Sequence, residues 1–261
     1  MSYNKFIMMI DAHAHLNDEL YADVKKLIDD ANEAAVNTII CSSYDLSSSM
    51  KAVEIANSFT GVYANVGMHP HDSKLYDDNM EKTFLELSTN KKVIAIGEIG
   101  LDYHYDYSPR QTQKEVFERQ ILLAKKLNLP IVIHMREATE DTIEILRQNK
   151  NNINLGGLVH CFNGSYETFK LIYEMGFIIS IGGALTFKNA KNLLELIPKI
   201  PKDGFIFETD CPYLTPEPFR GQINTPKNVK LVYDKASQIL NLELNELCKI
   251  VEENVKRVFK I

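Results

Sequence analysis

The sequence predicts an α/β protein folded as a single (β/α)8 TIM barrel with an additional C-terminal helix. Eight short apolar runs alternate with longer segments of helical periodicity, which is the pattern of repeated strand-helix units. Eight such units in 261 residues give the pitch of about thirty residues that each unit requires. No linker or low-complexity tract divides the chain. We therefore expect one domain spanning residues 1–261.

The eight predicted strands are rich in Ile, Val and Phe, as is typical of parallel strands buried on both faces. In chain order they are FIMMI before Asp11, NTIIC ending at Cys41, GVYANVG ending at Gly67, KVIAIG ending at Gly97, PIVIH ending at His134, GGLVH ending at His160, FIISIGG ending at Gly183 and FIFE ending at Glu208. In a barrel of this kind the carboxyl ends of the strands meet at one rim, which carries the reacting groups.

Covering helices are predicted where apolar residues recur every three or four positions. The clearest segments are Asp23 to Ala35, Arg110 to Leu127, Glu140 to Lys150 and Tyr166 to Met175. The tail from Leu242 to Lys260 has the same periodicity. It predicts one further amphipathic helix beside the last helix of the barrel.

Composition limits the classes of function. The 29 basic and 35 acidic side chains give a formal charge of −6, so any nucleic acid must be held by local groups rather than by an overall positive field. The four cysteines are far apart and are interpreted as reduced thiols. The N-terminal apolar stretch is too short for a signal segment, and no run reaches the roughly 20 residues of a membrane span. We expect a cytoplasmic protein without membrane association or an obligate protein partner.

All seven histidines fall at or just after the end of a predicted strand, and none falls in a predicted helix. They are His13, His15, His69, His71, His104, His134 and His160. A single histidine is more often an ordinary hydrogen-bonded side chain than a metal ligand. Seven imidazoles on one rim favour a metal site.

Several of these side chains are expected to converge. His13 and His15 are two apart on an extended segment, so their side chains leave the same face. His134, His160 and Asp210 follow strands five, six and eight, and they can meet above the first strand. Imidazole and carboxylate ligands together suit Zn²⁺, Mn²⁺ or another first-row divalent ion, whereas Mg²⁺ prefers more oxygen. The identity of the metal stays open.

Glu98 follows the fourth predicted strand in AIGEIGLDY. The glycines on either side let the backbone approach its neighbours closely. A carboxylate at this point can bridge two ions. Together with the four histidines, Glu98 is therefore interpreted as part of the metal site rather than as a surface or capping acid.

Six ordered motifs now allow a comparison with known families. They are DAHAHL at 11 to 16, GMHPH at 67 to 71, GEIGLDYH at 97 to 104, PIVIHMREA at 130 to 138, GLVHCFNGS at 157 to 165 and ETDCPYLTP at 208 to 216. With these motifs the sequence resembles the TatD-type metal-dependent deoxyribonucleases, a branch of the amidohydrolase-like barrels. The match runs nearly end to end.

The resemblance implies two divalent metal ions, Zn, Mg or Mn, per chain. It implies that His13, His15, Glu98 and Asp210 hold one ion, while Glu98, His134 and His160 hold the second. It also implies hydrolysis of phosphodiester bonds in DNA, single-stranded or at 3′ ends, with trimming from the 3′ end. A physiological substrate of DNA, RNA or a small phosphoester is compatible with the residues alone.

One position departs from the family pattern. Where the family continues with an Arg and then an Asn-Glu-Pro motif, this chain has Arg220 followed by Asn224, Thr225 and Pro226. The acidic member is missing. If that glutamate orients a neighbouring ligand, its replacement by Thr225 changes metal affinity or rate, since such changes often cost about 10- to 100-fold.

A paired-metal site can activate water and stabilise a leaving oxygen, so the protein mainly positions the reactants. Asp210 is the ligand carboxylate that is not assigned as a bridge. We therefore expect Asp210 to take the proton from the attacking water, with Glu98 as the bridging carboxylate.

Substrate contacts are predicted on the rim loops. Arg136, Arg220 and His69 are candidates for phosphate, with Lys188 a weaker one. Tyr103 flanks His104 together with Tyr105, and these rings are candidates for stacking on an unpaired base.

Two other classes of function compete with the nuclease. A carbonyl-directed hydrolase, such as a lactonase or amidase, can use the same ions. Its relatives carry a bridging lysine on strand four, where this chain has Glu98. A nucleic-acid-binding module with a structural metal is the second alternative, and the net negative charge disfavours it.

Overall fold

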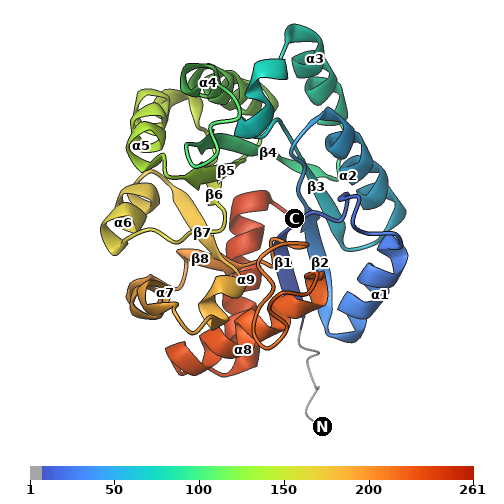
Figure 1. The fold of residues 1–261 in the computed structure, drawn as a ribbon, viewed down its shortest axis with the longest axis vertical. Coiled ribbons are helices and arrows are strands. Elements are labelled where there is room, and N and C mark those ends of the chain that lie inside the picture. Colours follow the sequence, from blue (N-terminus) through green and yellow to red (C-terminus); the bar gives the residue numbers. More distant parts are fainter. Residues whose placement is uncertain (1–7) are drawn as a thin grey trace.

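The computed structural model describes residues 8–261. Eight parallel strands form one sheet in chain order, and helices surround this nearly closed barrel (Figure 1). The strands are β1 (Met9–Ala14), β2 (Val36–Cys41), β3 (Val62–Val66), β4 (Val93–Asp102), β5 (Ile131–Arg136), β6 (Gly157–Val159), β7 (Phe177–Ile181) and β8 (Phe205–Phe207). The predicted (β/α)8 fold class is confirmed.

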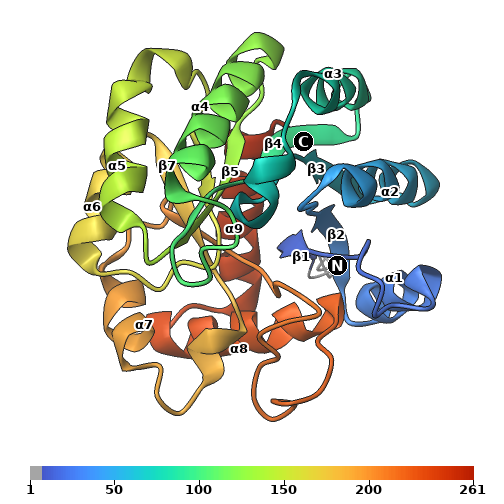
Figure 2. The ribbon, with the colours of Figure 1, turned by 45° about the horizontal axis from the view of Figure 1, so that its top comes forward.

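The helices alternate with the strands around the outside of the barrel (Figure 2). They are α1 (Val24–Glu33), α2 (Leu46–Ser58), α3 (Asp78–Leu87), α4 (Arg110–Leu127), α5 (Thr139–Gln148), α6 (Tyr166–Glu174), α7 (Lys191–Leu196), α8 (Val229–Leu240) and α9 (Leu244–Phe259). Polar caps fix several starts: Asp45 and Ser48 form a reciprocal capping box at α2, and Ser165 accepts the N–H of Thr168 at α6. Asn128 takes the left-handed conformation that ends α4.

The residues that follow β8 make the backbone contacts that close the barrel against β1. The backbone N–H of Asp210 donates to the carbonyl of His13, and the N–H of His15 donates to the carbonyl of Cys211. An isolated parallel bridge joins Ala14 to Cys211. These contacts therefore place Asp210 next to His13 in β1 and His15 just after it.

The additional C-terminal helix is also confirmed. Helix α9 packs against α8, as predicted, and also contacts β1, β6 and β8. The side-chain amide of Asn254 donates to the carbonyls of Lys202 and Phe205, each at 2.8 Å, at the start of β8. Leu247 and Val251 on the same helix are fully buried. The helix thus completes the core at the end of the barrel opposite the histidine rim.

Three strands extend beyond their predicted ends. β1 continues through Ala14, so His13 lies within the strand rather than after it, and β5 continues through Arg136, two residues beyond its predicted end at His134. Residues 6–7 of the first predicted run lie outside the described residues. The predicted end of β4 at Gly97 was wrong, because the strand continues to Asp102.

Glycine explains the extension of β4. A Cβ at Gly97 would lie 2.6 Å from the Cβ of Val132, and one at Gly100, where φ is +133°, would lie 2.1 Å from the carbonyl oxygen of His134. Only glycine allows this close approach. The register against β5 shifts between Ile96 and Ile99, so Glu98 sits at an irregularity of the strand.

Other expectations can be compared with the described residues. His71 lies in a short 3-10 helix, Pro70–Leu75, so the expectation of no histidine in a helix was wrong for this residue. None of the four cysteines forms a disulfide. No helix within residues 8–261 is long and apolar enough to cross a bilayer.

Candidate metal centre

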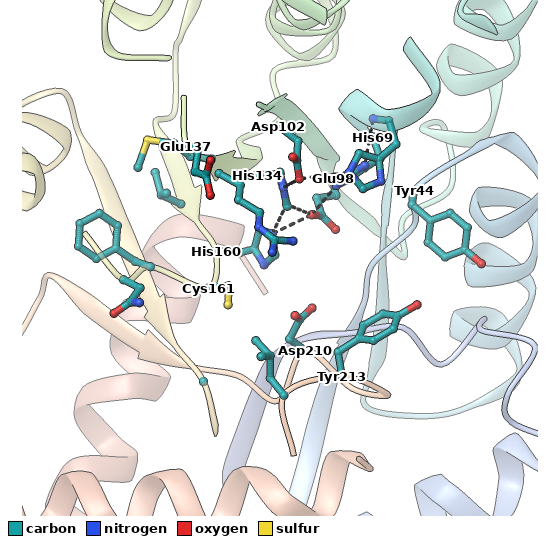
Figure 3. A pocket seen from close by; sticks show the side chains of 18 of the residues that line it. Tyr44, His69, Glu98, Asp102, His134, Glu137, His160, Cys161, Asp210 and Tyr213 are labelled. Carbon is teal, nitrogen blue, oxygen red and sulfur yellow. Dashed lines mark hydrogen bonds and ion pairs between the residues drawn. The ribbon is translucent and has the colours of Figure 1, made fainter. Parts of the chain in front are cut away.

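A cavity of about 910 Å³ opens at the carboxyl ends of the strands, and most of the predicted site residues line it. Figure 3 shows His69, Glu98, His134, His160 and Asp210 around its floor. They come from five separate loops or strands. The barrel rim therefore assembles side chains that lie far apart in the sequence.

Glu98 is the centre of this cluster and is buried. One carboxylate oxygen, Oε1, lies 2.7 Å from His134 Nδ1 and 2.7 Å from His160 Nε2. The other oxygen, Oε2, lies 3.3 Å from His13 Nε2 and 3.7 Å from His15 Nε2. The two oxygens thus face two different pairs of imidazoles, as expected of a bridging carboxylate.

Asp210 completes one side of the cluster. Its Oδ1 lies 3.4 Å from His15 Nε2 and 3.9 Å from His13 Nε2. Its position follows from the closing backbone hydrogen bond to His13. The predicted set of His13, His15, Glu98 and Asp210 is brought together on one side of Glu98, and His134 and His160 are brought together on the other.

Buried carboxylates hold the outer edges of the two imidazoles on the second side. His134 Nε2 lies 2.9 Å from Asp102 Oδ2, and His160 Nδ1 lies 3.8 Å from Glu208 Oε1. Glu208 itself accepts the N–H of Cys161 and the hydroxyl of Ser180. A carboxylate on the far nitrogen fixes ring orientation and leaves the near nitrogen directed at the cluster, as is common for metal-binding histidines.

The donor set fits divalent metal ions. Three groups of side chains have ligand atoms within 4.8 Å of one another, namely His13 with His160 and Asp210, His13 with His15 and Glu98, and His69 with Glu98 and His134. Both ring nitrogens of His13 and Nδ1 of His160 are buried without a hydrogen-bond partner among the described residues. Buried polar atoms are rarely left unpaired, and a bound ion would supply a partner for His13 Nε2, the ring nitrogen that faces Glu98 and Asp210.

The cluster shifts the pKa values of its members in opposite directions. Burial alone would raise the pKa of the Glu98 carboxyl, but the facing imidazoles of His160 and His69 hold it well below its usual range. Burial disfavours a charged His160, yet Glu98 and Glu208 raise its pKa well above the usual value. Burial and the neighbouring His134 lower the pKa of His69 to about 4. Glu98 is therefore ionised and His69 neutral at neutral pH.

His69 was predicted to contact phosphate, but its side chain lies within the cluster itself. Its Nε2 is 3.4 Å from Glu98 Oε1, and it can serve with Glu98 and His134 as a ligand. His71 packs beside it and places Nε2 3.1 Å from Asp102 Oδ2. Sequence reasoning missed Asp102, although it lies within the GEIGLDYH motif.

The predicted substrate-binding residues divide into two groups. Arg136 and His69 line the cavity, and so does Tyr105. Tyr103 does not line it: its hydroxyl donates to Asp141 and its ring lies under the guanidinium of Arg110. The structure thus gives Tyr103 partners of its own, and the stacking of a base on Tyr103 or Tyr105 stays a prediction.

Arg220 and Lys188 also lie away from the cavity lining. The guanidinium of Arg220 is 4.1 Å from the ring centroid of Phe187, and both cations are exposed. His104 Nδ1 pairs at 2.7 Å with Glu137, which lines the cavity. Phosphate contacts by Arg220 and Lys188 stay predictions.

The segment that departs from the family pattern supports the loop after β8. The side-chain amide of Asn224 donates to the carbonyls of Thr209 and Tyr213, and its oxygen accepts from Asn228 and from the N–H of Thr225. The Thr225 hydroxyl is buried without a partner among the described residues. The loop that carries Asp210 is thus held by the asparagine, and the effect of threonine on rate stays a prediction.

Comparison with known proteins identifies the family. The model of the family described as TatD related DNase matches residues 10–260. The chain belongs to this family. The resemblance read from the six motifs is thereby confirmed.

Relatives in the TatD family align over nearly the whole chain. It is 44% identical to the uncharacterized metal-dependent hydrolase YabD of Bacillus subtilis, over 97% of this chain and 100% of the relative. It is 32% identical to the uncharacterized metal-dependent hydrolase YcfH of Escherichia coli K12, over 98% and 97%. A crystal structure of YjjV, a TatD homologue from Escherichia coli K12, superposes with a TM-score of 0.92 at 25% identity, covering 98% and 99%. The chain is thus a member of a family of metal-dependent hydrolases.

Proposed function

We propose that this protein is a metal-dependent deoxyribonuclease that hydrolyses phosphodiester bonds in DNA as a 3′–5′ exonuclease. The observation that supports this proposal best is the position of Glu98, whose two oxygens face separate imidazole pairs at the floor of an open cavity. His13, His15, Glu98 and Asp210 would hold one divalent ion. Glu98, His134 and His160 would hold a second, with His69 beside them.

The bound ions would activate water at neutral pH and neutralise charge on a phosphoryl group, with Zn, Mg and Mn as the candidates. The protein supplies a proton acceptor and fixed geometry. Burial raises the pKa of Asp210, but the hydrogen bond from His15 and the facing imidazoles lower it below its usual value. Asp210 is therefore ionised, lies at the cavity surface, and is the group we assign to accept the proton of the attacking water.

Arg136 supplies the cation for the substrate. It lies at the end of β5, lines the cavity and makes no ion pair among residues 8–261. A guanidinium can bind phosphate oxygens in pairs. An unpaired guanidinium beside the cluster can form an ion pair with an anionic phosphodiester, whereas a neutral ester offers no charge for such a pair. The 3′–5′ polarity follows from the family resemblance alone.

A carbonyl hydrolase, such as a lactonase or amidase, is the alternative. The same centre could act on carbon instead of phosphorus, and the fold does not separate the two reactions. The bridging position holds Glu98, where a modified lysine would favour the carbonyl hydrolases. Arg136 and Glu98 together favour the phosphodiesterase.

The reaction class can be tested with two kinds of small substrate. Metal-stripped protein is given Zn²⁺, Mn²⁺ or Mg²⁺, and hydrolysis of bis(p-nitrophenyl) phosphate is compared with hydrolysis of an aryl ester and a lactone. We expect metal-restored cleavage of the phosphodiester, loss of that cleavage in Glu98→Gln, and retention in the control Glu144→Gln, an exposed carboxylate on α5 that does not line the cavity. Metal-restored turnover of only the carbonyl substrates would reject the proposal in favour of the alternative.

A further inference from the structure

Two tyrosines form an exposed stack at the mouth of the cavity. Tyr105 and Tyr107, in the loop between β4 and α4, have ring centroids 5.1 Å apart and an interplanar angle of 13°. They are 46% and 57% exposed, and both line the cavity that contains the metal centre. We call this pair the tyrosine shelf. Large aromatic rings exposed at a cavity mouth are typical of a binding site rather than of core packing.

Cations accompany the tyrosine shelf. The guanidinium of Arg136 lies 4.8 Å from the ring centroid of Tyr105. The ammonium of Lys74 donates to the backbone carbonyl of Tyr107 at 3.0 Å. Neither cation forms an ion pair with another of the described residues. The shelf therefore combines flat aromatic faces with uncompensated positive charge, which is the chemistry that binds unpaired nucleotides.

The loop beneath the shelf is held in place before any ligand arrives. Asp102 Oδ1 accepts the backbone N–H groups of His104 and Tyr105. The buried amide of Gln113 donates to the carbonyls of Asp102 and Ser108, so it ties the two ends of the loop together. A shelf that is already ordered loses little entropy when a ligand stacks on it.

Histidine rings connect the shelf to the metal centre. The ring of His71 lies 4.9 Å from Tyr107 and 5.5 Å from Tyr105. The ring centroids of His71 and His69 are 4.3 Å apart, and His69 in turn contacts Glu98. The shelf is thus separated from the carboxylate at the centre by two side chains. A polymer whose phosphate lies at the centre would place a neighbouring base at the shelf.

We propose that the tyrosine shelf is a subsite for an unpaired nucleobase of a single-stranded nucleic acid, next to the nucleotide whose phosphodiester lies at the metal centre. The inference rests on the proposed function and names how that site recognises its substrate. Stacking on Tyr107 and Tyr105 supplies affinity without sequence preference, because every base has a flat face. A paired base inside a duplex cannot reach the shelf, so the subsite selects single-stranded ends.

The absence of tryptophan from the sequence allows a direct test. Tyr107→Trp introduces a single indole at the shelf, and Leu122→Trp introduces one at an exposed position of α4 as the control. Short single-stranded oligodeoxyribonucleotides and oligoribonucleotides are titrated into each variant in the presence of chelator, and again with Ca²⁺. We expect saturable quenching of the fluorescence of Tyr107→Trp by both nucleic acids and none for Leu122→Trp.

Matched ligands identify the contact. An oligonucleotide of abasic sugar-phosphate and a blunt duplex should not quench. In competition, Tyr107→Ala should bind the single strand at least about 5-fold more weakly than the unaltered protein, and Tyr107→Phe should bind within about 2-fold. Equal quenching by the abasic strand, or none by any strand, would overturn the subsite.

Failure of the subsite and failure of the proposed function give different results. Quenching without hydrolysis of any phosphodiester would keep the base subsite and reject the nuclease. Metal-dependent hydrolysis of DNA without base-dependent quenching would keep the nuclease and reject the subsite.

Discussion

Asp210 is more exposed to the cavity than the other carboxylate of the centre, Glu98. Its side chain is 13% exposed, while that of Glu98 is 4% exposed. Glu98 is surrounded by imidazoles, so its oxygens are committed to them. At the scale of single residues, Glu98 is therefore the group that organises the centre and Asp210 the group that can exchange a proton with solvent.

The substitution Asp210→Asn tests this division. Asparagine keeps the size of the side chain but cannot accept the proton, so kcat should fall by about 10²- to 10⁴-fold. The far-ultraviolet circular dichroism spectrum and the melting temperature report whether the fold is retained. Full turnover in a folded Asp210→Asn variant would contradict the role.

Asp102 positions His134 through one hydrogen bond. The ionised carboxylate accepts from Nε2 of His134, which leaves Nδ1 directed at Glu98. Asp102→Asn presents an amide donor that favours the opposite ring tautomer, with the proton on Nδ1. Metal affinity, measured by competition with a chelator, should fall about 10- to 100-fold. Unchanged affinity would show that Asp102 has no such influence.

At the residue scale the side chains that meet in the cluster were predictable from the sequence, whereas the acids that support them were not. His13 and His15 share a strand face, and that local periodicity could be read directly. Asp102 and Glu208 are recognised only by contacts with His134 and His160, which lie 32 and 48 positions away along the chain. No local pattern separates such an acid from an ordinary loop acid.

The strands β1, β4 and β8 matter most at the scale of secondary structure. Their predicted ends were placed where the apolar runs stop, yet β1 and β4 continue into polar residues. An apolar run marks the part of a strand that packs in the hydrophobic core. The last residues of β1 and β4 are also buried but include polar side chains, so the apolar run stops before the strand does. The closing contact between His13 and Asp210 likewise depends on the geometry of the whole barrel.

Helix α9 should contribute to stability independently of the metal centre. Leu247 is fully buried on this helix. Leu247→Ala should lower the free energy of unfolding in urea by about 2 to 5 kcal/mol, because it removes buried methyl groups and leaves a cavity. The exposed Leu122→Ala is the matched control and should change stability by less than about 0.5 kcal/mol. Equal effects of the two substitutions would contradict the assigned packing.

For the molecule as a whole, protons and metal ions compete for the same ring nitrogens. Burial disfavours charge on His160 and His134, yet the facing carboxylates raise the pKa of both rings above the usual value. A raised pKa favours the protonated ring in the metal-free protein, and metal ions require the unprotonated ring. Metal affinity should therefore increase as pH rises through neutrality.

Calorimetric titration in two buffers of different ionisation enthalpy measures this proton release. We expect at least one proton released per chain at pH 7. The apparent Kd for Zn²⁺ should also decrease between pH 6 and pH 8. Proton-independent binding would mean that the rings are already neutral before the metal binds.

The fold of the whole molecule was the most predictable feature because it is built from eight repeats of one strand-helix unit. Each strand-helix unit carries the same apolar pattern, so an error at one boundary leaves the architecture unchanged. The orientation of rim side chains is not repeated. Tyr103 and Tyr105 are two positions apart in sequence, yet one pairs with Asp141 outside the cavity and the other lines it.

Release of nucleotides from end-labelled single-stranded DNA tests the central claim most directly. Metal-stripped protein is incubated with strands labelled at the 3′ end or the 5′ end, and Mg²⁺, Mn²⁺ or Zn²⁺ is added back separately. The account predicts metal-dependent stepwise shortening in which the 3′ label is lost first. Intact strands with every ion, from a protein that binds those ions at Glu98, would contradict it.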